Sequence, residues 1–304
     1  MAAHEPAPGS DTDVELLRTS PAMAPLIARA AVTAVGRPGV RGELPGRRVM
    51  LTGVQQDVER LAAYARVCGF TLRDRVPPTW LHVLTFPLQV HLMAGRDFPF
   101  AMAGMVHVAN EMSLLRPVRV GERLTLSTVA AGMRPHRSGV TVELVGQARV
   151  GDEPVWHGSS SYLVKGQRLP VPRDEAEAEP EPADDLDAPL VTPSARWRLH
   201  GGLGRDYAAV SGDVNPIHLN PLAAKAFGFP RTIAHGMWTH ARALAALESR
   251  LPEAYEVAVR FRKPVLLPTT VTFGTTQEGG EHRFLVASTD GSREHLIGRV
   301  RPLG

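Results

Sequence analysis

Two segments of this chain repeat one another, and the repeat restricts the fold more than any other feature of the sequence. Residues 64–69 and 207–212 share tyrosine, alanine, valine and glycine at matching positions. A basic residue followed by Pro-Val comes later in each copy, at residues 116–118 and 263–265, after a nearly equal interval. Similarity at a fixed spacing is typical of duplicated structural units. The sequence therefore predicts two copies of one fold.

Each copy places strand-like segments after a helical one. Apolar and polar residues alternate at 124–129, 139–150 and 155–164 in the first copy, and at 257–263, 271–276 and 283–288 in the second. Alternation with a period of two is the pattern of a strand that buries one face. We therefore predict an α+β fold in which antiparallel strands joined by short turns follow a helix in each copy.

An acidic segment lies between the copies. Residues 174–187 contain eight acidic residues and no basic one, with Pro180 and Pro182 among them, which is a composition typical of a linker. We accordingly divide the chain into a partly disordered N-terminal arm (1–47), a first domain (48–168), the acidic Pro-rich linker (169–191) and a second domain (192–304). Within the arm, residues 14–35 are expected to form one or two short helices.

The rest of the chain is more basic than the formal net charge of +3 indicates, because the linker holds many of the acidic residues. A basic body suits an anionic partner. Nucleic acid is not expected, since aromatic residues make up only 6% of the chain and no nucleic-acid motif is present. Coenzyme A (CoA) phosphates or an acidic acyl carrier protein fit better. Arg231, Arg260 and Arg262 are the nearest arginines to the motif described below.

Several other classes of protein do not fit this sequence. The single cysteine, Cys68, excludes an internal disulfide and a cysteine-based metal cluster. None of the 12 histidines has a convincing metal-ligand spacing, so no metal is expected. No apolar run approaches the roughly 18 residues of a membrane span. Glu5 and Asp11 do not suit a secretory signal, and we expect a cytoplasmic protein.

Residues 211–218, Ser-Gly-Asp-Val-Asn-Pro-Ile-His, carry the strongest chemical signal. They place Asp213 and His218 on a bent segment, with Gly212 and Pro216 interrupting any regular helix or strand. A carboxylate and an imidazole held together can transfer two protons near neutral pH. Seen alone, such a segment is more often a solvated turn. Gly236, at the start of an apolar helical run, would add free backbone N–H groups that suit an oxyanion.

The neighbouring residues extend this motif. Tyr-Ala-x-x-Ser-Gly-Asp-x-Asn-Pro-Ile-His begins at Tyr207, Ala-x-x-Ala-x-Gly-Phe at Ala223 and Ala-His-Gly-Met at Ala234. Together they resemble the signature of the MaoC-like (R)-specific enoyl-thioester hydratases and dehydratases. The resemblance implies the hotdog fold, in which an antiparallel sheet wraps a long helix. It also implies that Asp213 and His218 form the catalytic pair, with Ser211, Asn215 and Tyr207 supporting the site.

The first copy lacks this pair, because Phe70 stands where the second copy has Asp213. Its central helix is expected to be short, since residues 85–95 allow only about three turns, and this would leave space inside the sheet. The asymmetry, together with residues 97–101, resembles the double-hotdog members of the family, whose non-catalytic N-terminal half makes room for a long acyl chain. Phe98, Phe100 and Met102 are candidates for the wall of an acyl tunnel, although simple packing is the favoured interpretation for any one of them.

The implied reaction is the reversible dehydration of (R)-3-hydroxyacyl thioesters to trans-2-enoyl thioesters. The substrate would be carried on CoA or acyl carrier protein without another cofactor, and the Gly236 N–H is our candidate donor to the thioester oxygen. His107, His235 and His240 are expected to have structural roles. Two alternatives stay open, an acyl-CoA thioesterase and a non-catalytic subunit that binds acyl thioesters. A monomer and a homodimer are both compatible with two fused copies.

Overall fold

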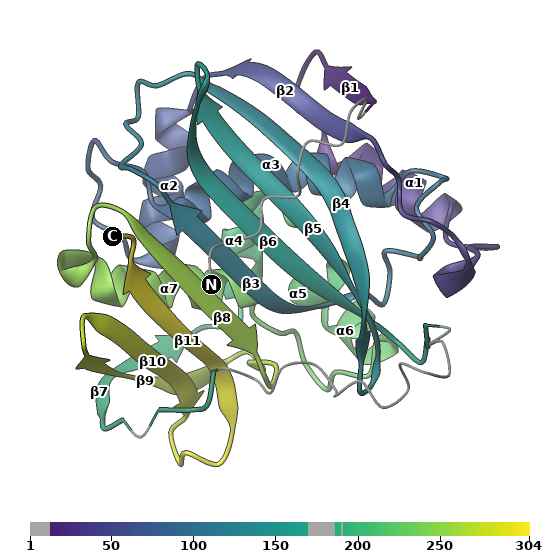
Figure 1. The fold of residues 1–304 in the computed structure, drawn as a ribbon. Helices are drawn as coiled ribbons and strands as arrows, with labels where there is room; N and C mark the ends of the chain where they lie inside the picture. The colour runs from purple at the N-terminus through teal and green to yellow at the C-terminus, as the bar shows by residue number, and fades with distance from the viewer. Residues whose placement is uncertain (1–12, 170–185, 190) are drawn as a thin grey trace, which may run out of the picture.

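The computed structural model describes residues 13–169, 186–189 and 191–304 of the chain. The eleven described strands form one sheet, which covers one side of the molecule, while the helices lie on the other side (Figure 1). Most of the predicted linker, and the part of the arm predicted to be disordered, lie outside the described residues. Among the described helices, none is long and apolar enough to cross a membrane.

Two halves of the sheet have the same strand arrangement in mirrored order. The first half runs β2 (Arg48–Val54), β4 (Leu124–His136), β5 (Gly139–Val150), β6 (Glu153–Lys165) and β3 (Val106–Leu114). The second half continues with β8 (Tyr255–Phe261), β11 (Glu294–Pro302), β10 (Glu281–Ser288), β9 (Thr269–Glu278) and β7 (Pro193–Leu199). The halves join where β3 pairs antiparallel with β8, from Ala109 opposite Arg260 to Leu114 opposite Tyr255.

A central helix lies beneath each half of the sheet. These are α3 (Pro78–Met93) and α7 (Gly236–Leu247), the latter followed by the short 3₁₀ helix η3 (Glu248–Arg250). The prediction of a shorter first helix was wrong, because α3 has 16 residues and α7 has 12. Pro78 occupies the first helical position, which proline favours, so the helix begins well before residue 85. Burial on nearly every side stabilises α3 despite Pro87 in its interior.

Shorter helices cover the side of the two central helices that faces away from the sheet. They are α1 (Met23–Val32), the 3₁₀ helix η1 (Gly39–Arg41), α2 (Val58–Cys68), α4 (Leu203–Ser211), α5 (Pro216–Leu219) and α6 (Pro221–Ala226). The arm differs from the prediction in one respect. Its first described element is a strand, β1 (Val14–Leu17), because this segment pairs in parallel with β2 and forms the edge of the sheet. Only α1 is an α-helix in this part of the arm.

Candidate active site

The end of α4 and the start of α5 bring the motif residues into one bend. Gly212 caps α4 in the left-handed conformation, with φ of 80°, which favours glycine. Asn215 then caps α5, and Pro216 takes the first helical position. We had expected Pro216 to exclude a regular helix, and this was wrong, because proline is well suited to a helix start. His218 therefore lies on a short helix and Asp213 lies in the turn before it.

Asp213 and His218 face one another across this bend. A carboxylate oxygen of Asp213 and a ring nitrogen of His218 lie within 4.8 Å. The side chain of Asp213 is 29% exposed, whereas His218 is only 9% exposed. The pair therefore has one group that solvent reaches and one that is nearly enclosed.

The hydrogen bond of His218 fixes its tautomer. Its Nδ1 lies 2.8 Å from the carbonyl oxygen of Ile233, which can only accept, so Nδ1 carries the proton. The Nε2 atom is left with a lone pair. Burial lowers the pKa of His218, although the Asp213 carboxylate and the Ile233 carbonyl act in the opposite direction. His218 is therefore a neutral base at neutral pH.

His235, which we had expected to have only a structural role, touches both members of the pair. Its Nε2 donates to the backbone carbonyl of Asp213 at 2.9 Å, and its ring stacks on His218 with centroids 3.7 Å apart. The ring also packs against Tyr207 at 4.9 Å. Burial lowers the pKa of His235 well below its usual value. A neutral, buried ring thus holds the loop of Asp213 against the face of His218.

The three residues predicted to support the site all lie around the loop. The hydroxyl of Ser211 accepts a hydrogen bond from the Asp213 N–H at 3.1 Å. The N–H of Asn215 donates to Oδ1 of Asp213 at 3.2 Å, and its side chain caps α5. Tyr207 is buried and reaches the site through its contact with His235. Local hydrogen bonds thus hold the carboxylate in one orientation.

Gly236 begins α7 beside this loop. The N–H groups of a first helical turn have no carbonyl partner within the helix, so they are available to an anion. A Cβ atom at this position would lie 3.0 Å from the ring of Phe261. Glycine therefore allows close contact between β8 and the start of the helix, and it leaves the backbone accessible at the position where we predict the thioester oxygen.

Asp213, His218 and His235 also form the one cluster among the described residues that could be considered for a metal ion. The donor atoms do not suit one. The Nε2 of His235 must carry a proton to donate to the Asp213 carbonyl, so it has no lone pair to offer. That leaves one imidazole nitrogen and one carboxylate, fewer than the three protein ligands usual for a catalytic zinc.

Comparison with known proteins identifies the family to which this chain belongs. A model described as "MaoC like domain" matches residues 204–295. The 3-hydroxyacyl-thioester dehydratase X of Mycobacterium tuberculosis is 38% identical over 285 residues, which cover 94% of this chain and 100% of that relative. The chain belongs to the MaoC-like dehydratase family.

Solved structures support the same fold. The crystal structure of HtdX of M. tuberculosis superposes with a TM-score of 0.73 and 36% identity, covering 84% of this chain and 100% of that one. A conserved hypothetical M. tuberculosis protein described as having a double hotdog fold gives a TM-score of 0.55 at 16% identity, covering 88% of this chain and 98% of that one, and so supports the fold alone. The predicted α+β double hotdog is confirmed.

The three candidates for the wall of an acyl tunnel lie outside the loop that carries Asp213 and His218. Phe98 and Phe100 are buried against one another, with ring centroids 6.3 Å apart, and Met102 is partly buried in the same core. The arm covers them, since the Gly39 N–H donates to the Pro99 carbonyl at 2.9 Å. These contacts favour packing. The reason for expecting space inside the sheet, a shortened first helix, does not hold, because α3 is the longer of the two.

A group of buried aromatic and histidine side chains lies between the halves. The ring of His107 stacks with Tyr162 at 4.7 Å and contacts Phe261 at 5.0 Å and His82 at 6.2 Å. His240 lies on α7 and is completely buried. Burial lowers the pKa values of His82 and His240 to about 4 and about 3. The positions of His107 and His240 agree with the predicted packing roles, whereas the sequence did not single out His82.

Proposed function

We propose that this chain catalyses the reversible dehydration of (R)-3-hydroxyacyl thioesters to trans-2-enoyl thioesters. The observation that carries the proposal is the pairing of Asp213 with a neutral His218 whose Nε2 is free, beside the N-terminus of α7. The relative that covers most of this chain is named as a dehydratase of that substrate class. The proposed reaction needs no cofactor other than the CoA or carrier protein that holds the acyl group.

The tautomer of His218, which leaves Nε2 able to accept a proton, suggests how the pair carries out the two proton transfers. In hydration, the neutral Nε2 of His218 takes a proton from the water that adds to C3, and the pair then delivers a proton to C2. In dehydration, the pair takes the C2 proton and delivers a proton to the departing hydroxyl. Water thus supplies, or carries away, both the C3 hydroxyl and the C2 proton, so that Asp213 and His218 begin and end each turnover in the same protonation state. The Gly236 N–H would stabilise the enolate-like thioester oxygen.

The test is hydration of crotonyl-CoA and of a long-chain trans-2-enoyl-CoA by the purified protein. We expect loss of the enoyl absorbance, with formation of the (R)-3-hydroxyacyl-CoA established by chiral separation. Comparing the two rates would also show whether a long chain is accepted. A product of the opposite configuration would contradict the proposed reaction.

The two alternative functions predict different products in the same assay. A thioesterase would release free CoA, which a thiol reagent detects, and a binding subunit would retain the acyl-CoA without changing it. Neither alternative explains why the acid–base pair is complete in the second half. A monomer and a homodimer both remain compatible with the proposal, because the fused halves already form one continuous sheet.

A further inference from the structure

Helix α2 of the first half packs against the end of α4, from which the loop of Asp213 starts. Nε of Arg60, on α2, donates a hydrogen bond to the carbonyl oxygen of Val210 at 2.7 Å. Val210 is the next-to-last residue of α4, so its carbonyl is one of those at a helix end that have no N–H partner within the helix. The first half thus supplies a donor to the segment that leads directly to Asp213.

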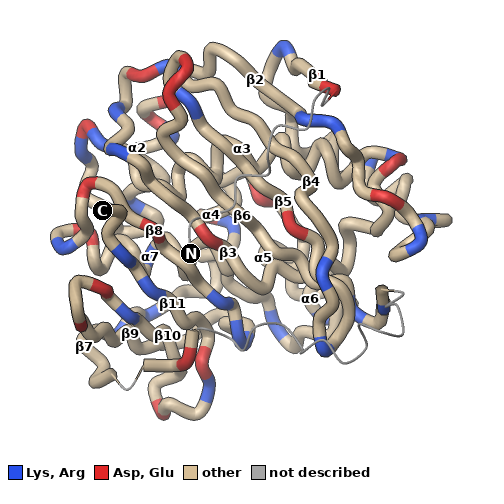
Figure 2. Tube along the Cα trace, in the orientation of Figure 1, with Lys and Arg blue, Asp and Glu red and all other residues tan. Residues whose placement is uncertain are grey.

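Contacts within the first half hold Arg60 in a defined position. Its guanidinium carbon lies 5.3 Å from the centroid of the Trp80 ring, a distance typical of a cation–π contact. Many basic residues lie around the edge of the molecule in Figure 2, whereas Arg60 is partly buried. Burial lowers the pKa of Arg60, because desolvation disfavours a charge, but a guanidinium stays protonated. Its hydrogen bond to Val210 is therefore charge-assisted and stronger than one between neutral groups.

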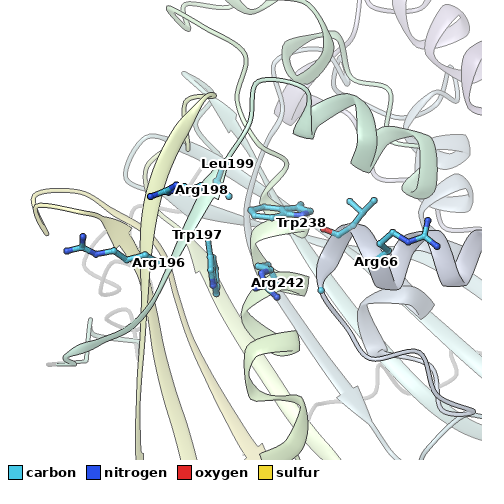
Figure 3. Close-up of a pocket in the computed structure, with 9 residues that line it drawn as sticks. Arg66, Arg196, Trp197, Arg198, Leu199, Trp238 and Arg242 are labelled. Atoms are coloured by element: carbon cyan, nitrogen blue, oxygen red, sulfur yellow. Dashed lines mark hydrogen bonds between the residues drawn. The ribbon is translucent and has the colours of Figure 1, made fainter.

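The same helix also contacts the start of α7. The indole Nε1 of Trp238 donates to the carbonyl oxygen of Val67, on α2, at 3.0 Å. Figure 3 shows the Trp238 side chain directed from α7 towards α2, which carries Arg66. Trp238 is two residues from Gly236, our candidate donor to the thioester oxygen. Helix α2 therefore contacts both elements that bear the site, the end of α4 and the beginning of α7.

The sequence repeat shows that this arginine is not shared by the two halves. When the two copies are aligned on Tyr64 and Tyr207, the position of Arg60 falls on an apolar residue of the second half. That residue, Leu203, is buried and cannot donate a hydrogen bond. Of these two aligned positions, the one with a charged donor is thus the one directed at the helix end that leads to the acid–base pair. The asymmetry favours a role in catalysis over packing that both halves would share.

We propose that Arg60 is a positioning residue of the active site, contributed by the non-catalytic half. Its hydrogen bond to the Val210 carbonyl holds the end of α4, so that the carboxylate of Asp213 stays opposite His218. Arg60 acts through this loop rather than on the substrate. The inference rests on the proposed hydratase–dehydratase activity and gives the first half a function beyond completing the sheet. A misplacement of about 1 Å can lower the rate of an enzyme by about 10², so loss of this contact should be measurable.

The experiment measures hydration of crotonyl-CoA by the wild-type protein and by variants of Arg60. Arg60→Met keeps an unbranched side chain but removes the donor. It should lower kcat roughly tenfold with little change in KM, because one charge-assisted hydrogen bond is lost. Arg60→Lys keeps a charged donor and should recover part of that loss. A role in packing alone predicts similar kcat values for the two variants.

Arg116→Met is the matched control. Arg116 is also partly buried, and it donates to the backbone carbonyl of Pro117 at 3.0 Å and to two carboxylates. It follows the end of β3 that pairs with the start of β8, whereas Gly236 lies against the last residue of β8. Both methionine variants should lower the free energy of unfolding, which urea titrations measure, but Arg116→Met should keep the wild-type kcat.

The outcomes separate this inference from the proposed function. A wild-type kcat in Arg60→Met, or equal losses of kcat in the two methionine variants, would overturn the inference while leaving the reaction established. If Arg60→Met does not fold, Arg60→Gln takes its place, because it removes the charge and should still lower kcat. A wild-type kcat in that variant would be equally decisive against the inference. Failure of the wild-type protein to hydrate crotonyl-CoA would instead contradict the proposed function.

Discussion

Asp213 and His218 are the residues on which turnover is expected to depend most. Asp213→Asn and His218→Gln each remove a proton-transfer group while keeping nearly the same volume, so each should lower kcat by about 10²–10⁴. The measurement is steady-state hydration of crotonyl-CoA, with circular dichroism to show that the fold is intact. Because the two groups act as a unit, the double variant should be little worse than either single one. Near-wild-type turnover in both single variants would refute the assignment.

His235 is expected to act by positioning the catalytic pair. His235→Phe keeps the stacked ring but removes the donor to the Asp213 carbonyl, and it should lower kcat roughly tenfold with little change in KM. His235→Gln retains an N–H donor and should recover part of the loss. A role in packing alone predicts the reverse order, since phenylalanine preserves the ring and glutamine does not. The kcat values of the two variants distinguish these roles.

At the scale of single residues, the sequence was informative where the site is continuous in the chain. Asp213 and His218 could be named from one short segment, because their neighbours Ser211, Gly212 and Asn215 specify its local turns. The stacking of His235 on His218 could not be predicted, since it depends on how the start of α7 packs beside α5.

At the scale of secondary structure, close contact between α4 and α5 sets the position of His218. A Cβ atom on Gly204 would lie 2.1 Å from the His218 carbonyl oxygen, which is backbone and cannot turn aside. Gly204→Ala should therefore separate the two helices, decrease the free energy of unfolding by about 1–3 kcal/mol and decrease kcat. Gly201→Ala is the matched control, because its added Cβ would meet only Pro268 at 3.8 Å. Equal stability and turnover in the two variants would contradict this interpretation.

The sequence predicted helices and strands best where pattern and local signals agree. The boundaries of β5 were predicted to the residue from alternation alone. The length of α3 was misjudged because this helix is buried on nearly all sides and has no polar face to mark its extent. Edge strands such as β7, with exposed arginines on alternate positions, gave too weak a signal to be recognised.

At the scale of the whole molecule, duplication could be predicted from the sequence, but the way in which the copies join could not. The repeat indicated two similar units, whereas the seam depends on the pairing of β3 with β8 and on central helices packed side by side. This seam encloses His82, His107 and His240 between the halves. Histidines buried there in neutral form couple the stability of the whole fold to pH.

Acid should therefore destabilise the protein below pH 6.5, the ordinary pKa that these histidines regain on unfolding. Folding lowers the pKa of His82 to about 4 and that of His240 to about 3, so over this interval the unfolded chain binds protons that the native state does not. The free energy of unfolding should decrease by about 1.4 kcal/mol per pH unit for each histidine. Urea titrations at pH 7, 6 and 5 measure this slope. His240→Leu should reduce this slope by the contribution of one histidine. His200→Gln, which replaces an exposed histidine, should leave the slope unchanged. An unchanged slope in His240→Leu would show that its ring is not the group that titrates.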